Sequence, residues 1–172
     1  TLVPAIKGEK IGAMCFTEDQ SGSDLAGTRT VATKVDGGWR INGQKQWITN
    51  GPIAEFATVM ATVDRNMGLK GLNFYLVEKK TENRDGFVPG QKIHKLGSRC
   101  SVTGELVFDN VFVPDENFLG EEIGKGVQYA GEILNEVRVM TGMNALAIAK
   151  EAMEDARQYA NNRIAFGSPI SK

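Results

Sequence analysis

The stretch that decides the fold is Cys15-Phe16-Thr17-Glu18-Asp19-Gln20-Ser21-Gly22-Ser23-Asp24. It leaves an apolar strand pattern over residues 11–16 and breaks into a loop of small and polar residues. Glycine and serine let such a loop approach a ligand closely and present backbone N–H groups and hydroxyls to it. The same composition is also typical of a plain turn, so this loop alone does not define a site.

A second informative stretch is Gln46-Trp47-Ile48-Thr49-Asn50-Gly51, which places an indole between polar neighbours and ends in an Asn-Gly turn signal. A tryptophan can cover a flat aromatic ligand while the Thr49 hydroxyl contacts the edge of that ligand. The alternative for any single tryptophan is a place in the core. We expect that structural role for Trp39.

The pattern between residues 11 and 113 is that of β-strands, with short apolar or alternating runs bounded by Gly, Asn and Asp. Tight turns are expected at Asp36-Gly37-Gly38 and at Asn42-Gly43. Closely spaced strands with glycine-rich connections predict a barrel or sandwich, not βαβ units. Strands are expected over residues 28–35, 39–41, 45–49, 56–63, 72–78, 87–88, 92–93, 104–109 and 111–113.

The hydrophobic period changes at about Gly120, where apolar residues begin to recur every three and four positions. This predicts one amphipathic helix, or two in succession, running to about Arg163. Gly142 lies inside that run and marks either close helix packing or a break. The fold class is therefore α+β, with the β part first. We place a β domain at 1–120 and the first helix of a truncated α-helical domain at 121–172.

Composition excludes several classes of protein. The chain has 172 residues, 41% hydrophobic content and a formal net charge of -1, which is typical of a globular protein and argues against a nucleic-acid surface. No apolar run approaches the roughly 20 residues of a membrane span. Cys15 and Cys100 are too few for a disulfide framework and are expected to be reduced thiols. His94 lacks neighbours at ligand spacing, so no metal site is expected.

In this order and spacing, the two stretches resemble the acyl-CoA dehydrogenase family. Further matches cover essentially the whole chain: Leu96-Gly97-Ser98-Arg99, Val107-Phe108-Asp109-Asn110-Val111-Phe112-Val113-Pro114, Leu119-Gly120-Glu121, Leu134-Asn135-Glu136-Val137-Arg138 and Arg163-Ile164-Ala165-Phe166-Gly167. The resemblance implies the antiparallel β-barrel or orthogonal sheets of the family's middle domain, followed by a long helix of an incomplete bundle. Since the sequence starts at Thr1 and not at Met, we expect a fragment of a longer enzyme.

The resemblance also implies the chemistry. Family members use FAD to oxidise the Cα–Cβ bond of an acyl-CoA thioester to the 2-enoyl-CoA. They pass the electrons to electron-transfer flavoprotein, form homodimers or homotetramers, and occur in the bacterial cytoplasm or the mitochondrial matrix. The resemblance assigns cofactor contacts to Met14, Phe16, Thr17, Gly22, Ser23, Trp47, Ile48, Thr49, Arg163 and Phe166, and substrate contacts to Ser23, Asn135 and Arg138.

Three departures from the family pattern bear on function. Asp19 stands where the family usually has proline, and Met14 replaces a frequently aromatic residue. Val137 occupies a position where some members carry their catalytic glutamate, and Glu136 is rotated about 100° from that helix face. The general base is therefore expected beyond Lys172, and the chain alone is expected to be inactive.

Other functions remain open at this point. A flavin oxidase or flavin-dependent monooxygenase could use the same fold, and a family-like binding or scaffold protein could have lost catalysis. A standalone carbohydrate- or lipid-binding barrel is a third class, which leaves the helix ending in Arg163 unexplained. Acyl chain length and branching are not readable from these residues. We expect self-association through the apolar stripe between Val127 and Ala160.

Overall fold

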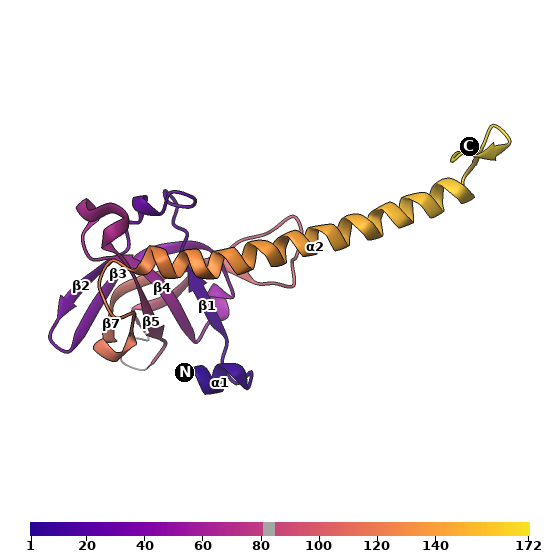
Figure 1. Cartoon of the computed structure of the whole chain (residues 1–172). Helices are drawn as coiled ribbons and strands as arrows, with labels where there is room; N and C mark the ends of the chain where they lie inside the picture. The colour runs from indigo at the N-terminus through magenta and orange to yellow at the C-terminus, as the bar shows by residue number, and fades with distance from the viewer. Residues whose placement is uncertain (81–84) are drawn as a thin grey trace. The chain divides into compact units, whose positions relative to one another are not determined.

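The computed structural model describes residues 1–80 and 85–172. These residues fall into two compact units, 1–128 and 129–172, which are described separately. The first unit carries the β-sheet, whereas the second contains most of one long helix and a small hairpin (Figure 1). The α+β class, with the sheet before the helix, is confirmed.

The first unit opens with the short helix α1 (Leu2–Ile6). Short 3₁₀ turns follow at Leu25–Gly27, Gly51–Ile53, Arg65–Gly71 and Asp115–Asn117. Its strands are β1 (Gly12–Cys15), β2 (Val31–Val35), β3 (Gly38–Thr49), β4 (Phe56–Thr62), β5 (Leu72–Glu78), β6 (Phe87–Lys92), β7 (Thr103–Pro114) and β8 (Phe118–Leu119).

The strands form one sheet in the order β6-β7-β3-β2-β4-β5-β8, and β1 also pairs with β4. Most neighbours are antiparallel, but β1–β4 and β2–β4 are parallel. A parallel pair needs a long crossover, and here the β2–β3 hairpin lies between β1 and β4 in the chain. The β-rich domain is as expected, but within the described residues the path is open at β6 and β8. It therefore does not close into a wholly antiparallel barrel.

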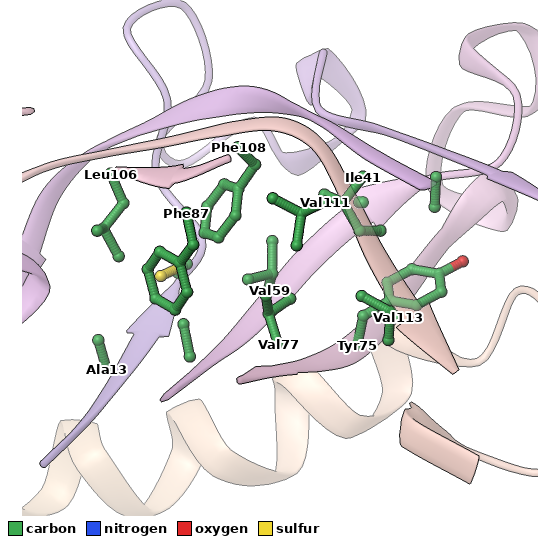
Figure 2. Packing of buried hydrophobic residues seen from close by; sticks show 14 of the residues in the cluster. Ala13, Ile41, Val59, Tyr75, Val77, Phe87, Leu106, Phe108, Val111 and Val113 are labelled. Atoms are coloured by element: carbon green, nitrogen blue, oxygen red, sulfur yellow. The ribbon is translucent and has the colours of Figure 1, made fainter. Parts of the chain in front are cut away.

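The core lies between β3 and β7 on one side and β4 and β5 on the other (Figure 2). Val59 and Val77 meet Ile41, Phe108 and Val111 there, and all five side chains are at most 2% exposed. Burying an aliphatic or aromatic side chain of this size stabilises a fold by about 1.5–3 kcal/mol. The folded-over sheet is thus a rigid scaffold for the loops attached to it.

An aromatic cluster extends the core. Trp39 lies edge-on to Tyr75 with ring centroids 5.4 Å apart, and stacks on Phe118 at 5.8 Å. Trp39 is only 7% exposed. The expected structural role of Trp39 is confirmed.

One turn prediction was wrong. β3 runs unbroken through Asn42-Gly43, where we expected a tight turn. The extra residue belongs instead to β7, where Asn110 has a φ of 51° and its N–H donates to Asn42 Oδ1 at 2.8 Å. A Cβ at Gly43 would lie 2.4 Å from Thr30 Oγ1, so glycine here permits close approach of two backbones. The Asp36–Gly38 turn between β2 and β3 is confirmed.

The second unit is dominated by α2 (Gly126–Asn162), which is one continuous helix. Gly142 does not break it, and a Cβ at Gly142 would meet no atom within 4 Å. A two-stranded hairpin of β9 (Ile164–Ala165) and β10 (Ser168–Pro169) follows. No helix in the described residues has the length and apolar character that a membrane crossing requires.

Candidate functional site

The two stretches singled out in the sequence lie side by side. The Gln46 N–H donates to the Thr17 carbonyl at 2.9 Å, just beyond the end of β1. At the other end of β1, Asn50 Nδ2 donates to the Gly12 carbonyl at 3.4 Å. Residues 12–17, which are β1 and the two residues after it, therefore run beside residues 46–50 at the end of β3.

Side-chain alternation gives this pair of segments an inner and an outer face. Ala13, Cys15 and Ile48 point into the core. Burial raises the pKa of the Cys15 thiol to about 12, so this thiol is not a nucleophile at neutral pH.

The outer residues form a partly apolar surface, which we call the β1–β3 face. Met14 is 43% exposed and Trp47 is 57% exposed, whereas Phe16 is half-buried against the edge of Phe74. Thr49 is exposed beside them. The β1–β3 face consists of Met14, Phe16, Thr17, Trp47 and Thr49.

Trp47 is turned outward by a β-bulge. Lys45 pairs with Leu106 and Ile48 with Gly104, so β3 carries one more residue than β7 between these pairs. Trp47 has a φ of 60°, which is unusual for a bulky residue and costs about 1–3 kcal/mol. An indole held exposed at that cost indicates a function outside the chain's own packing.

The loop after Phe16 is held by short-range hydrogen bonds. Glu18 and Ser21 bond to each other's backbone in both directions, and Ser21 Oγ donates to the Asp24 carbonyl at 2.7 Å. Gly22 and Ser23 are exposed at the tip. Gly22 does not have a positive φ, and a Cβ there would meet nothing within 4 Å. Neither backbone conformation nor packing within the described chain requires glycine at position 22.

Beneath the loop lies a buried ion pair that the sequence interpretation missed. Lys45 Nζ lies 2.8 Å from Glu18 Oε1, and the two side chains are 0% and 3% exposed. Lys45 Nζ also donates to the Phe16 carbonyl at 3.0 Å. The Glu18 carboxylate accepts the N–H groups of Arg29 and Thr30 at 2.7 and 3.0 Å. The pair therefore connects β3, the end of β1 and the segment that enters β2.

Both members of the pair have a shifted pKa. Burial alone would raise the pKa of Glu18, but the charge and hydrogen bond of Lys45 and the surrounding N–H donors outweigh it and hold that pKa below its usual value. Burial lowers the pKa of Lys45, and the Glu18 carboxylate opposes this shift. Glu18 is therefore ionised at neutral pH.

Four further residues predicted to bind ligand belong to the second unit. Asn135 and Arg138 are exposed on α2. Arg163 follows the last turn of α2, and the hairpin bends at Phe166-Gly167, where φ is 50° and 84°. Phe166 is fully exposed at that bend. Like Trp47, it is an exposed aromatic residue at a positive φ.

Other hollows and clusters suit a flat ligand less well. A polar cavity of about 660 Å³ is lined by Arg29, Arg65, Gln44, Gln46 and Glu105 among others, and no aromatic side chain lines it. Within residues 1–80 and 85–172, no three His, Cys, Asp or Glu side chains gather at metal-binding distance. The β1–β3 face is therefore the better candidate, since it combines an exposed indole with two hydroxyl side chains.

Comparison with known proteins finds a match for each of the two parts of the chain. The family model described as "Acyl-CoA dehydrogenase, middle domain" matches residues 13–111. The model described as "Acyl-CoA dehydrogenase, C-terminal domain" matches residues 124–172. The two matches follow the order of sheet and helix in the chain.

Individual relatives are similar over almost the whole chain. Benzylmalonyl-CoA dehydrogenase of Aromatoleum aromaticum is 44% identical and is matched over 98% of this chain and 43% of its own length. The structure of butyryl-CoA dehydrogenase from Megasphaera elsdenii superposes with a TM-score of 0.89 at 42% identity, over 99% of this chain and 44% of that one. An acyl-CoA dehydrogenase complexed with FAD from Bacillus anthracis gives a TM-score of 0.85 at 37% identity, over 98% of this chain and 28% of that one. The chain thus spans less than half the length of these relatives.

Proposed function

Since the chain belongs to the acyl-CoA dehydrogenase family, we propose that it supplies the flavin-facing β domain and the first C-terminal helix of an FAD-dependent acyl-CoA dehydrogenase. The reaction is oxidation of the Cα–Cβ bond of an acyl-CoA thioester to the 2-enoyl-CoA. The observation that carries this proposal is the β1–β3 face, where an exposed indole in a strained backbone stands beside Met14, Phe16 and Thr17.

The residues present fit a flavin. An isoalloxazine ring is flat and apolar on its faces, and it carries hydrogen-bonding groups along one edge. Trp47 offers a flat apolar wall, and the Thr17 and Thr49 hydroxyls can donate to or accept from the ring edge. The side chain of Ile48 lies in the core, so only its backbone is available for a ligand. Gly22 leaves open space in which a ligand could approach the loop backbone.

Bound FAD would supply the acceptor for the hydride that leaves Cβ of the substrate. The chain's own residues hold and orient the reactants. Trp47 excludes water from one side of the ring, Thr17 fixes its polar edge, and Ser23 contacts the acyl-CoA at the loop tip.

The second unit supplies polar contacts in the same proposal. Asn135 and Arg138 border the substrate channel, while Arg163 and Phe166 reach the FAD of a neighbouring subunit. A guanidinium matches a pyrophosphate in charge and in its paired donors. The assembly is a homodimer or homotetramer, and electrons leave to electron-transfer flavoprotein. Exposed apolar residues of α2 such as Leu146 and Met153 would be covered in that assembly.

The general base that removes the α proton lies outside this chain in our proposal. Val137 cannot take a proton, and Glu136 is turned about 100° from that helix face. Residues 1–172 alone are therefore expected to be inactive, even where they retain some affinity for FAD.

The proposed reaction is tested by anaerobic addition of acyl-CoA thioesters to the complete flavoprotein. We expect at least one thioester with a β carbon to bleach the flavin absorbance. Acetyl-CoA is the matched control, because it lacks a β carbon and cannot give an enoyl product. A bound flavin that stays oxidised with every thioester would contradict the proposal. If that flavin were then reduced chemically, its rapid reaction with oxygen would indicate an oxidase or monooxygenase.

A further inference from the structure

We propose that Glu18 and Lys45 are positioning residues for the flavin: they form a directional clamp that fixes the β1–β3 face without touching the cofactor. This inference rests on the proposed function, because it assumes that FAD binds this face. The two side chains are at most 3% exposed, and Glu18 borders the polar cavity, not the β1–β3 face. Any effect on the flavin must therefore pass through the residues that they hold.

The clamp lies where the residues after β1 meet β3, and these two segments carry the β1–β3 face. Lys45 is one residue before Gln46, whose N–H bonds Thr17, and it donates directly to the Phe16 carbonyl. Glu18 directly follows Thr17 and accepts two N–H groups from the segment entering β2. Each of Phe16, Thr17 and Trp47 is thus within two residues of a clamp contact.

The contacts are directional as well as electrostatic. Lys45 only donates, and it satisfies a carbonyl on the β1 side. Ionised Glu18 only accepts, and it satisfies two N–H groups on the β2 side. A pair with the charges exchanged would keep the attraction but would offer a donor to N–H groups and an acceptor to a carbonyl.

Burial of this pair is not an efficient source of stability. Apolar residues of similar volume often stabilise a core as well as a buried ion pair does, or better. Hydrogen bonds in both directions do fix the relative positions of the three segments that meet there. The Glu18–Lys45 pair therefore contributes a defined geometry of the β1–β3 face more than it contributes stability.

The clamp is tested with the double variant Glu18→Gln, Lys45→Met in the complete protein. The Arg29 and Thr30 N–H groups bond different oxygens of Glu18, so the new amide oxygen keeps one of these two bonds. Removal of both charges leaves neither charge unpaired. We expect a folded protein whose FAD dissociation constant rises at least tenfold and whose flavin absorption bands shift. The Phe16 carbonyl has lost its donor, so Phe16 and Thr17 are no longer fixed against β3.

Val77→Ala is the matched control, because Val77 is fully buried in β5 and makes no contact in the clamp. Val77→Ala should lower stability, whereas its FAD dissociation constant and its flavin absorption spectrum should stay those of the wild type. A double variant that matches the wild type in both FAD affinity and spectrum would overturn the positioning role. The charge-exchanged variant Glu18→Lys, Lys45→Glu should fail to restore wild-type affinity, and full restoration would also overturn it.

A second measurement uses the unmodified protein, so it does not depend on variants that fold. Coupling between two sites is reciprocal, so a clamp that favours FAD must itself be stabilised by FAD. We expect hydrogen exchange at the Arg29, Thr30 and Gln46 amides to slow on FAD binding by more than exchange at the β4 and β5 amides. Equal protection of both groups would overturn the inference. A protein that binds no FAD would instead overturn the proposed function, and this inference with it.

Discussion

Replacing Lys45 with Met is expected to lower the free energy of unfolding by about 3–5 kcal/mol at neutral pH, because it leaves a buried carboxylate without its counter-charge. The substitution removes both the 2.8 Å contact with Glu18 and the donor to the Phe16 carbonyl. Chemical denaturation of the complete protein, followed by fluorescence, measures the effect.

Lys7→Met is the matched control for that experiment. Lys7 lies 4.0 Å from Glu9, and both side chains are about 60% exposed. Exposed ion pairs contribute about 0–1 kcal/mol, so this variant should unfold almost as the wild type does. Equal effects of the two substitutions would show that burial of the Lys45 pair has no energetic consequence.

The loss of stability in Lys45→Met should also depend on pH. In the wild type the pKa of Glu18 is held below its usual value, so the pair's contribution is present above the unfolded-state pKa and is lost as the pH falls through the folded-state pKa. Without Lys45 the pKa of Glu18 should lie above its wild-type value, because burial is then opposed only by the hydrogen bonds that remain. The stability difference between wild type and Lys45→Met should therefore narrow as the pH is lowered from 7 towards 4. A difference that grows in acid would contradict the assignment of Glu18 as the ionised partner.

The second large effect is expected from replacing the two tryptophans of the chain. One replacement should weaken FAD binding, and the other should lower stability. Trp47→Ala should weaken FAD binding about ten- to a hundredfold, because stacking on an aromatic side chain contributes about 1–3 kcal/mol. Its effect on stability should stay within about 0.5 kcal/mol, since the indole is exposed. Trp39→Ala should instead lower stability by about 3–5 kcal/mol, because Trp39 packs against Tyr75 and Phe118 in the core.

Flavin content after gel filtration and the denaturation midpoint together measure this contrast in the complete protein. For Trp39→Ala, the flavin content is expressed per mole of protein that remains folded. If Trp47→Ala retained FAD at wild-type affinity, the indole would not be part of the flavin site.

Secondary structure could be predicted well where hydrophobic alternation was regular. β4, β5 and the long α2 follow directly from their apolar periods. The Asn42-Gly43 turn was wrong because an Asn-Gly pair is a strong local turn signal, whereas here a bulge in β7 and the close approach of Thr30 keep the strand running. Such tertiary contacts leave no trace in a local pattern.

The buried ion pair was not predicted, for a similar reason. Counting every second residue inward from Trp39 and Ile41 would have placed Lys45 in the core, a signal that was in the sequence but that our sequence analysis did not use. The same count would also have buried Trp47 and exposed Ile48. The bulge after Lys45 reverses both, and only the register between β3 and β7 reveals it. Glu18 was read as part of a polar loop because its partner is 27 residues away.

The most direct test of the account is whether FAD lies against Trp47. Fluorotryptophan labelling gives each tryptophan a ¹⁹F resonance, and the variants Trp47→Phe and Trp39→Phe assign the resonances of these two residues within the complete protein. We expect stoichiometric FAD to shift the Trp47 resonance strongly through the ring current of the flavin and to leave that of buried Trp39 nearly unchanged. A Trp47 resonance that does not move when FAD is fully bound would place the flavin elsewhere and contradict the proposed site.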